Sequence, residues 1–192
     1  MIKKLGELNL MQRDQFVDLF TDCFIKDIDK DLKFQDQEKV IFADAFIKDY
    51  AAAYLVEEKV AGLVAFSNME HSSVRFSREL CIKQAGKIFG SVFYWVLKNF
   101  FEKPTARHEN EGYIDFLCVN RNYRRRGIAS KLLDFAYKQE QKPYYILGVL
   151  SKNENAIRLY EKQGYKKTHT RKGFFIWLFL HDSVDMMRLE RI

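Results

Sequence analysis

The feature that most constrains the fold of this chain is a basic, glycine-containing turn between an apolar run and a helical pattern. The apolar run covers residues 114–119, the turn VNRNYRRRGIA covers residues 119–129, and the helical pattern covers residues 130–139. The sequence thus predicts a strand, a tight turn and a helix in direct succession. Backbone N–H groups at the start of a helix, where the helix dipole is positive, stabilise anions. Gly127 has no Cβ to keep a phosphate oxygen from the backbone, and the small Ala129 follows it.

A second block downstream also predicts a strand followed by a helix. Residues 144–150 form a short, fully apolar run of the kind expected for a buried central strand. Asn153 is a good N-cap, and apolar side chains after it, Tyr160 included, fall on one face of the helix. Gly164 then lies where a helix commonly ends with a residue in the left-handed conformation.

Together, the two blocks resemble the two signatures of the GNAT superfamily of acetyltransferases. Arg124-x-x-Gly127-x-Ala129 resembles its pyrophosphate-binding turn, and the second block resembles its Asn-capped helix, which ends in Leu-Tyr-Glu-Lys-x-Gly-Phe/Tyr. This motif core covers residues 113–167, under a third of the chain, and elsewhere the resemblance lies in the order of elements. It implies an α/β (α+β) fold with a single GNAT domain over residues 1–192, in which helices flank a mixed, mostly antiparallel sheet.

Members of this superfamily pass the acetyl group of acetyl-CoA directly to a primary amine. The resemblance therefore implies an acetyl-CoA-dependent N-acetyltransferase whose acceptor is an unidentified small molecule or peptide. In the family, the strand before the turn splays from the next strand, and its backbone holds the pantetheine arm and polarises the thioester carbonyl. The residues that the resemblance assigns to the cofactor are Leu117, Cys118, Val119, Arg124, Arg125, Arg126, Gly127, Ile128, Ala129, Ser130 and Asn153. Of these, Arg125 and Arg126 are expected to act through the backbone, and Asn153 also serves as a plain N-cap.

The resemblance assigns the catalytic acid to Tyr160, because the family places a tyrosine hydroxyl here near the CoA sulfur. A phenol is protonated at neutral pH and can donate a proton to the departing thiolate, although Tyr160 also suits a core position. Some members carry a glutamate base where this chain has Gly148. Our candidate base is Asp115, which shares a strand face with Tyr113, close to where other members place a glutamate. The weaker candidates are Glu111 and His108. A water relay without a single base is the alternative.

Apolar spacing predicts further elements outside the motif core. Helices are expected over residues 11–25 and 36–47, and strands joined by a short hairpin turn over residues 51–56 and 60–67. Residues 184–191 alternate like a partly exposed antiparallel strand.

A helical insertion around residues 73–103 is not explained by the family core. Within it, residues 80–101 predict one long helix with apolar side chains around most of its circumference. Lysines and a glutamine interrupt it too often for a membrane span, which needs about 20 predominantly apolar residues. We expect a core helix or a homodimer contact, and alternatively the wall of an acceptor pocket or a lipid contact. The similarly apolar residues 173–180 are a candidate to pack against it.

Composition limits the other classes of function. The net charge of +6 suits an anionic ligand, but no nucleic-acid-binding motif accompanies the arginines, so no nucleic acid partner is expected. Three cysteines in apolar settings favour reduced thiols, and the N-terminus lacks an apolar signal region, so we expect a cytoplasmic protein. The four histidines stand far apart and no Cys-x-x-Cys occurs, so no metal site is expected. Transfer of another acyl group, transfer to a hydroxyl, and a non-catalytic acyl-CoA-sensing module remain the alternatives.

Overall fold

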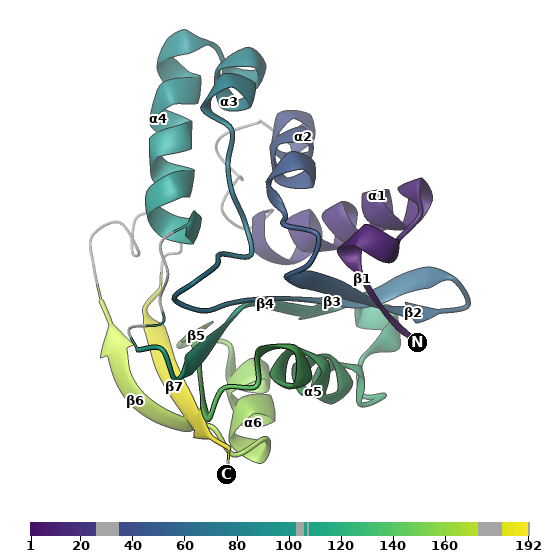
Figure 1. Ribbon diagram of the computed structural model, residues 1–192, viewed down its shortest axis with the longest axis vertical. Helices are drawn as coiled ribbons and strands as arrows, with labels where there is room; N and C mark the ends of the chain where they lie inside the picture. The colour runs from purple at the N-terminus through teal and green to yellow at the C-terminus, as the bar shows by residue number, and fades with distance from the viewer. Residues whose placement is uncertain (26–34, 103–105, 107, 173–181, 192) are drawn as a thin grey trace.

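The computed structural model describes residues 1–25, 35–102, 106, 108–172 and 182–191. In this part of the chain, seven strands form one sheet between two helical layers (Figure 1). Helices from the first half of the chain cover one face, and two later helices cover the other.

The sheet is mixed and mostly antiparallel, as the sequence predicts. Its strands lie in the order β1 (Ile2–Lys4), β2 (Ala51–Val56), β3 (Lys59–Ser67), β4 (Glu111–Val119), β5 (Tyr144–Leu150), β7 (Val184–Glu190) and β6 (Lys166–Arg171). Strands β4 and β5 run parallel, and the other neighbours run antiparallel. The predicted C-terminal strand is confirmed as β7. Strand β6 is almost entirely exposed, so it carries too little apolar pattern to be predicted.

The described residues form six α-helices and several short helical turns, which lie on the two sides of this sheet. The first face carries α1 (Leu10–Phe20), α2 (Gln35–Ala45), α3 (Arg78–Ala85) and α4 (Lys87–Leu97), and the second carries α5 (Ile128–Glu140) and α6 (Glu154–Lys162). The turns are η1 (Leu5–Glu7), η2 (Thr21–Ile25), η4 (Lys98–Glu102) and η5 (Arg121–Tyr123). The first two predicted helices are confirmed, with η2 continuing α1 to its predicted end.

Local sequence explains how these elements begin and turn. Helix α1 starts at a capping box, in which Asn9 and Gln12 each accept a backbone hydrogen bond from the other, of 2.9 and 3.2 Å. The predicted hairpin of β2 and β3 is confirmed. Its turn residues Glu57 and Glu58 both have positive φ, 49° and 62°, which matches the twist of a two-residue hairpin.

Apolar side chains fill the space on both faces of the sheet. On the α1 side, the ring of Phe20 lies 4.9 Å from the rings of Phe46 and Phe116, nearly perpendicular to each. On the α5 side, Leu132 is fully buried against β3. Gly62 permits this close approach, because a Cβ there would lie 3.1 Å from the Leu132 side chain.

The expected single helix over residues 80–101 is wrong, because the chain reverses within it. Gly86, with a φ of +79°, ends α3, and α4 then folds back to make a helical hairpin that stands away from the sheet (Figure 1). Gly90 lies at the contact between the helices, where a Cβ would collide with the backbone of Cys81 and Ile82. Gly86 and Gly90 indicated a break between two helices, but the continuous apolar content around them favoured one helix.

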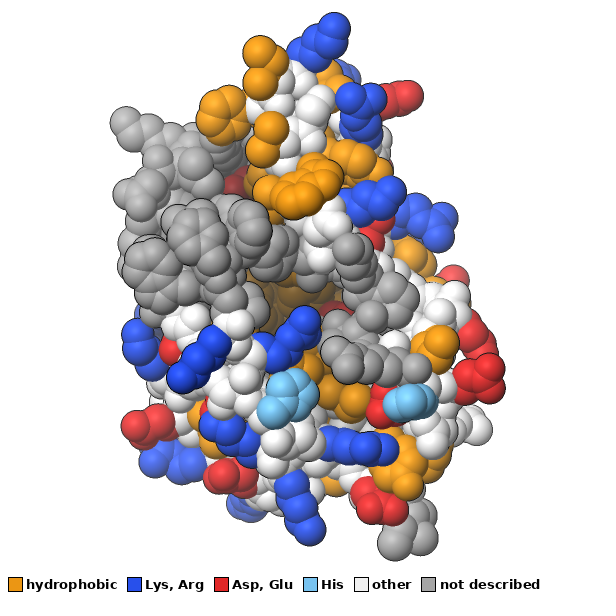
Figure 2. Space-filling view, turned by 90° about the vertical axis from the view of Figure 1, so that its left-hand side faces the viewer, with side chains coloured by type: hydrophobic (Ala, Val, Ile, Leu, Met, Phe, Trp, Pro, Cys, Tyr) orange, Lys and Arg blue, Asp and Glu red, His pale blue; other side chains and the backbone are white. Residues whose placement is uncertain are grey.

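Helix α4 presents apolar side chains on two sides. Phe93 and Tyr94 pack against the core beside α1 and α2. Four other large side chains are more than half exposed: Ile88, Phe89, Val92 and Trp95. Figure 2 shows apolar side chains gathered at the top of the view, over this helix. The helix is thus a core element on one side and an apolar surface on the other.

Cys23 and Cys118 form a disulfide between η2 and β4, with a Cα–Cα distance of 6.6 Å and a sequence separation of 95. The prediction of reduced thiols is therefore wrong for this pair, whereas Cys81 is a free, buried thiol. The number and surroundings of the cysteines could not reveal the pairing, because it depends on η2 lying against β4 in the folded chain.

The sequence predicts no membrane span and names residues 173–180 as a candidate to pack against the 80–101 segment. None of the described helices is both long and apolar enough to cross a membrane. The apolar residues 173–180 lie outside the described residues.

Candidate active site

Strands β4 and β5 separate halfway along their length. Their parallel pairing ends at Ile114↔Leu147, although both strands continue beyond these residues. On their outer edges both stay paired, β4 with β3 and β5 with β7. The facing edges of residues 115–119 and 148–150 therefore present backbone N–H and C=O groups to a gap that an extended ligand can enter. This gap, called the splay below, lies where the resemblance implies it.

A β-bulge in β4 lies at the start of the splay. In the pairing with β3, Phe66 lies opposite Ile114 and Ala65 lies opposite Phe116, so Asp115 has no partner. Residues at i and i+2 share a face in a regular strand, but here Ile114 is buried on the α5 side and Phe116 on the α1 side. The bulge lies at the point where β4 leaves β5, and it changes the direction of the Asp115 side chain.

The Asp115 carboxylate is enclosed by polar side chains of β3 and of the β3–α3 connection. Its Oδ1 accepts a hydrogen bond of 3.0 Å from Ser67 Oγ. Its Oδ2 is buried and has no hydrogen-bond partner among the described residues, and the same is true of Ser73 Oγ and His71 Nδ1. Ser67 and Ser73 are themselves buried, whereas Asp115 as a whole residue is half-buried.

Burial raises the pKa of Asp115 from 3.8 to about 7. The main cause is the loss of water around the carboxylate, which disfavours its charged form. The hydroxyls of Ser73 and Ser67 and the imidazole of His71 lower this pKa, and the carboxylate of Glu140 raises it. A carboxylate with a pKa near 7 can accept a proton and release it again at neutral pH.

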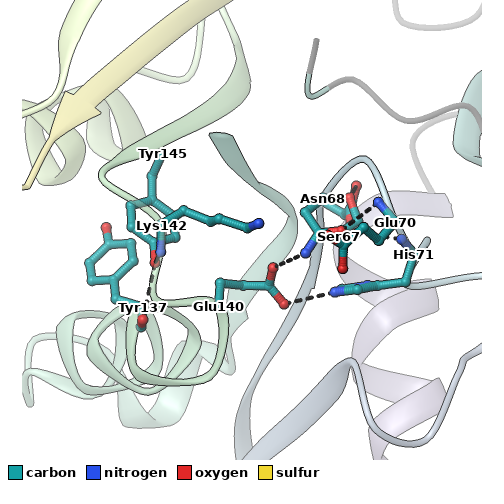
Figure 3. A network of polar contacts seen from close by, with 9 residues as sticks. Ser67, Asn68, Glu70, His71, Tyr137, Glu140, Lys142 and Tyr145 are labelled. Carbon is teal, nitrogen blue, oxygen red and sulfur yellow. Dashed lines mark hydrogen bonds and ion pairs between the residues drawn. The ribbon is translucent and has the colours of Figure 1, made fainter. Parts of the chain in front are cut away.

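His71 is held in place from two directions. Its Nε2 lies 3.0 Å from Glu140 Oε1, and its ring stacks on the Tyr50 ring with centroids 3.5 Å apart and an interplanar angle of 6°. Glu140 ends α5 and also accepts a hydrogen bond of 2.7 Å from Asn68 Nδ2, so its carboxylate lies between Asn68 and His71 (Figure 3). Asn68 Oδ1 accepts backbone hydrogen bonds from Glu70 and His71, which fixes the turn.

The basic turn after β4 leads directly into α5, as predicted. Gly127 has a φ of +71° and precedes the helix without a side-chain cap. A Cβ at Gly127 would meet no atom within 4 Å, so the space beside it is open. The first backbone N–H groups of α5 thus face this space without a side chain to cap them, which fits a bound diphosphate.

The arginines of this turn are exposed, as expected for Arg125 and Arg126. Arg124 Nε donates a hydrogen bond of 3.2 Å to the carbonyl oxygen of Val119, which ties the turn to the end of β4. The Arg126 guanidinium lies 5.5 Å from the centre of the Tyr123 ring. These contacts shape the turn and leave its backbone open.

The remaining residues assigned to the cofactor surround the same strand end and helix start. Ile128 is buried beneath the turn, and Ser130 Oγ accepts a hydrogen bond of 3.1 Å from Gln163 Nε2 at the end of α6. The Cys118 side chain points to the α1 side, where it bonds Cys23, so only its backbone faces the splay edge. The half-buried members of the set are Leu117, Val119, Ala129 and Ser130.

Asn153 and Tyr160 both lie on α6. Asn153 Oδ1 caps the helix by accepting a backbone hydrogen bond of 3.2 Å. Tyr160 is buried in the α5-side core, with its ring 5.7 Å from that of Tyr165. Burial raises the pKa of the Tyr160 hydroxyl above its usual value, and Tyr137 and Tyr113 add to the effect. The hydroxyl therefore stays protonated at neutral pH, and its core position does not conflict with proton donation.

Gly148 lies on β5 just beyond its last pair with β4. A Cβ at this position would lie 2.9 Å from the Val184 side chain and 3.2 Å from the Tyr113 hydroxyl. A glutamate therefore cannot be accommodated here unless these side chains move. The Val184 side chain and the Tyr113 hydroxyl thus fill the space that a glutamate would need at this position.

The weaker base candidates lie at and just before the start of β4. Glu111 is buried, where its Oε1 lies 3.8 Å from Arg188 Nη2 and its Oε2 accepts a hydrogen bond of 3.2 Å from the backbone of His108. His108 itself is exposed. Among the described residues, no group of three or more His, Cys, Asp and Glu side chains is arranged to hold a metal ion.

Sequence reasoning missed the polar residues around Asp115. They are Ser67, Asn68, His71, Ser73 and Glu140. Four of them lie within residues 67–73, at the end of an apolar strand, and this grouping is only a weak indication of a functional site. Their relation to Asp115 depends on β4 pairing with β3 and on α5 returning its last residue to the same end of the sheet, and no spacing in the sequence reveals that.

Comparisons with known proteins identify the family of this chain. The model of the Acetyltransferase (GNAT) family matches residues 13–165. An N-alpha-acetyltransferase of Saccharolobus solfataricus is 33% identical over 85 residues, which cover 42% of this chain and 50% of that protein. The match thus spans about half the length of this relative.

Solved structures share the fold at low identity. An N-acetyltransferase from Staphylococcus aureus Mu50 superposes with a TM-score of 0.64 and 18% identity over 98% of this chain and 100% of that chain. A ribosomal-protein-alanine N-acetyltransferase from Brucella melitensis superposes with a TM-score of 0.56 and 14% identity over 100% of this chain and 99% of that chain. These likenesses concern the fold. Because the family model extends from α1 to the end of the second signature and includes both the splay and the basic turn, this chain belongs to the GNAT family of acetyltransferases.

Proposed function

We propose that this acyltransferase moves the acetyl group of acetyl-CoA to a primary amine. The observation that carries the proposal is the bulge at Asp115, a residue of β4 that lies at the start of the splay and carries a carboxyl with a pKa of about 7. Tyr160, in the α5-side core, supplies a protonated phenol in this proposal.

The seat for acetyl-CoA in this proposal has two parts. The uncapped start of α5 and the open space at Gly127 receive the diphosphate. The unpaired edge of residues 115–119 receives the pantetheine arm as an added strand, and a backbone N–H there polarises the thioester carbonyl. Asn153 assists at the opposite edge.

The proposed reaction needs a base and an acid. Asp115 takes a proton from the ammonium group of the acceptor, and the freed amine forms a bond to the carbonyl carbon. The carbon–sulfur bond breaks, and Tyr160 donates its proton to the departing thiolate. Tyr160 regains a proton from the nitrogen of the new amide, so the net products are the amide, CoA and the proton held by Asp115.

For the acceptor, we propose the α-amine of a peptide as the first class to test. The support is the relative named N-alpha-acetyltransferase, which is 33% identical over 85 residues. Polyamines, aminoglycosides and free amino acids form the other arms of the test.

The experiment is a thiol-release assay with acetyl-CoA against this panel of amines. We expect release above the rate without acceptor for one class, and roughly a 10²-fold lower kcat in Tyr160→Phe with unchanged CoA affinity. An unchanged kcat in Tyr160→Phe would reduce this residue to packing. CoA binding without turnover for any acceptor would favour an acyl-CoA-sensing module, and faster turnover with a longer acyl group would favour another donor.

We also propose a cytoplasmic location, where acetyl-CoA is made and used, and a homodimer formed through the exposed face of α4. Recovery of the protein outside the cytosolic fraction of broken cells would contradict this location.

A further inference from the structure

The Asp115 carboxyl lies on the α1 side of the sheet. Its Oδ1 accepts a hydrogen bond of 3.0 Å from Ser67 Oγ, and Ser67 comes two residues after Ala65, which is buried in the α1-side core. Residues at i and i+2 of a strand share a face. Phe116 pairs with Ala65 and is buried in the same core. An acceptor amine that reaches Asp115 therefore lies beside Phe116.

Two further phenylalanine rings meet Phe116 on this side. The ring of Phe24 in η2 lies 5.3 Å from the Phe116 ring, and the ring of Phe101 in η4 lies 5.7 Å from it. Phe116 is buried, whereas Phe24 and Phe101 are half-buried, so part of each of these two side chains is accessible. Three elements far apart in the sequence thus bring these three phenylalanines, called the aromatic wall below, to the residue next to the candidate base.

The aromatic wall is held in position from outside the site. The neighbour of Phe24 in the chain, Cys23, forms the disulfide with Cys118, so η2 is joined covalently to β4. The ring of Phe101 packs on two other rings of the core, with centroids 6.2 Å away in each case. A surface that is already ordered loses little conformational entropy when a ligand covers it.

The space beside β5 at the splay is filled by other side chains. Leu147 and Val149 are buried on the α5 side, so Gly148 between them faces the α1 side. A Cβ at Gly148 would lie 3.2 Å from the Tyr113 hydroxyl and 2.9 Å from the Val184 side chain. A bulky group of the acceptor therefore cannot lie there unless these side chains move.

We propose that the aromatic wall receives the first side chain of an acceptor peptide and selects a large apolar one, such as Leu, Met or Phe. The inference rests on the proposed function, in which Asp115 takes a proton from the α-ammonium group of the peptide. The first side chain is attached to the carbon next to that amine, so it meets the wall beside Asp115. Covering apolar rings with an apolar side chain is favourable. An acidic first residue instead brings a second carboxylate close to Asp115, and like charges repel.

The test compares peptides that differ only in their first residue, which is Leu, Ser or Asp. Thiol release from acetyl-CoA gives kcat/KM for each peptide. We expect kcat/KM for the Leu-first peptide to exceed that for the Ser-first peptide roughly 10-fold or more, with the Asp-first peptide slowest. A Ser-first or Asp-first peptide that reacts as fast as the Leu-first peptide would overturn the inference.

Removing a ring of the wall should weaken this preference. In Phe24→Ala the ratio of kcat/KM between the Leu-first and Ser-first peptides should fall roughly 3-fold or more, with the KM for acetyl-CoA unchanged. Phe101→Ala should act in the same way. A variant that is merely less stable loses rate with both peptides alike and keeps the ratio. The matched control is Phe135→Ala, at a half-buried phenylalanine on the α5 side, which should also keep it. An unchanged ratio in both folded wall variants would contradict the proposal.

Calorimetry of the same peptides with the protein–CoA complex measures the preference without any reaction. The Leu-first peptide should bind roughly 10-fold more tightly than the Ser-first peptide. This preference without thiol release from any amine would contradict the proposed reaction and support the apolar subsite. Thiol release with all first residues alike, or only with acceptors other than peptides, would overturn the inference and leave acetyl transfer standing.

Discussion

At pH 7 the Asp115 carboxyl is close to half ionised, because burial raises its pKa from 3.8 to about 7. The folded protein therefore binds this proton more tightly than the unfolded chain does. The stabilisation that this group provides is complete below pH 3.8 and is lost as the pH rises through 7. Above that pH the protein carries a buried, incompletely paired charge at Asp115.

The substitution Asp115→Asn should separate the proposed role of this carboxyl in catalysis from its effect on stability. It should lower kcat by roughly 10²-fold or more, because the amide cannot accept the proton. It should also raise the free energy of unfolding at pH 8, by up to about 4 kcal/mol, and change it little at pH 4. Denaturant unfolding at both pH values measures this. Asp134→Asn on the exposed side of α5 is the control and should show no such difference.

Gly127 should matter more to CoA binding than the arginine beside it. Gly127→Val places a branched side chain at a φ of +71° and in the open space proposed for the diphosphate. It should weaken CoA binding at least 10-fold and cost about 1–2 kcal/mol of stability. Arg125→Gln should change both much less, because the Arg125 side chain is exposed. Calorimetry with CoA gives the affinities.

Gly86→Val is the control for the strain. Gly86 also has a positive φ, +79°, and open space around a Cβ, but it lies in the α3–α4 hairpin. It should lose stability without losing CoA affinity. Equal loss of CoA affinity in Gly127→Val and Arg125→Gln would contradict binding through the backbone.

Most of the helices and strands whose ends and faces are set by nearby residues could be predicted from the sequence. The strand–turn–helix unit around Gly127 and the Asn153-capped helix were predictable because cap, periodicity and turn residues agree there. The bulge at Asp115 was not, because it follows from the burial of Ile114 and Phe116 on opposite faces of the sheet, which only the packed layers reveal. The candidate base was therefore found by sequence and its surroundings only by the fold.

The exposed face of α4 should mediate self-association. Val92 and Trp95 are 58% and 56% exposed on a hairpin that stands away from the sheet, and apolar surface of this kind is stabilised when covered. Val92→Glu should lower the molecular mass seen by light scattering toward that of one chain, with CoA affinity intact. Val40→Glu, at a 45% exposed valine of α2, should leave the mass unchanged. A monomeric unmodified protein would rule this contact out.

At the scale of the whole molecule, the Cys23–Cys118 bond joins the outer helical layer to the strand that borders the splay. A cross-link over a sequence separation of 95 restricts the unfolded chain and should contribute up to about 4 kcal/mol in the entropic description. A reducing agent should therefore lower the melting temperature of the unmodified protein. The same agent should have no effect on Cys23→Ser, which should already melt at the lower temperature. An equal drop in the melting temperature of both proteins would show that the reducing agent does not act through this disulfide.

That bond also makes a closed covalent ring of the chain from Cys23 to Cys118. The ring contains α2, the β2–β3 hairpin and the whole α3–α4 hairpin, whereas the basic turn, α5 and α6 lie outside it. A protease that cuts once anywhere inside the ring would open it without releasing a fragment, so the two pieces would stay one molecule until reduced. The part of the chain after Cys118 would thus stay linked to the outer helical layer after a break in the exposed hairpin, and gels run with and without reductant would show the difference.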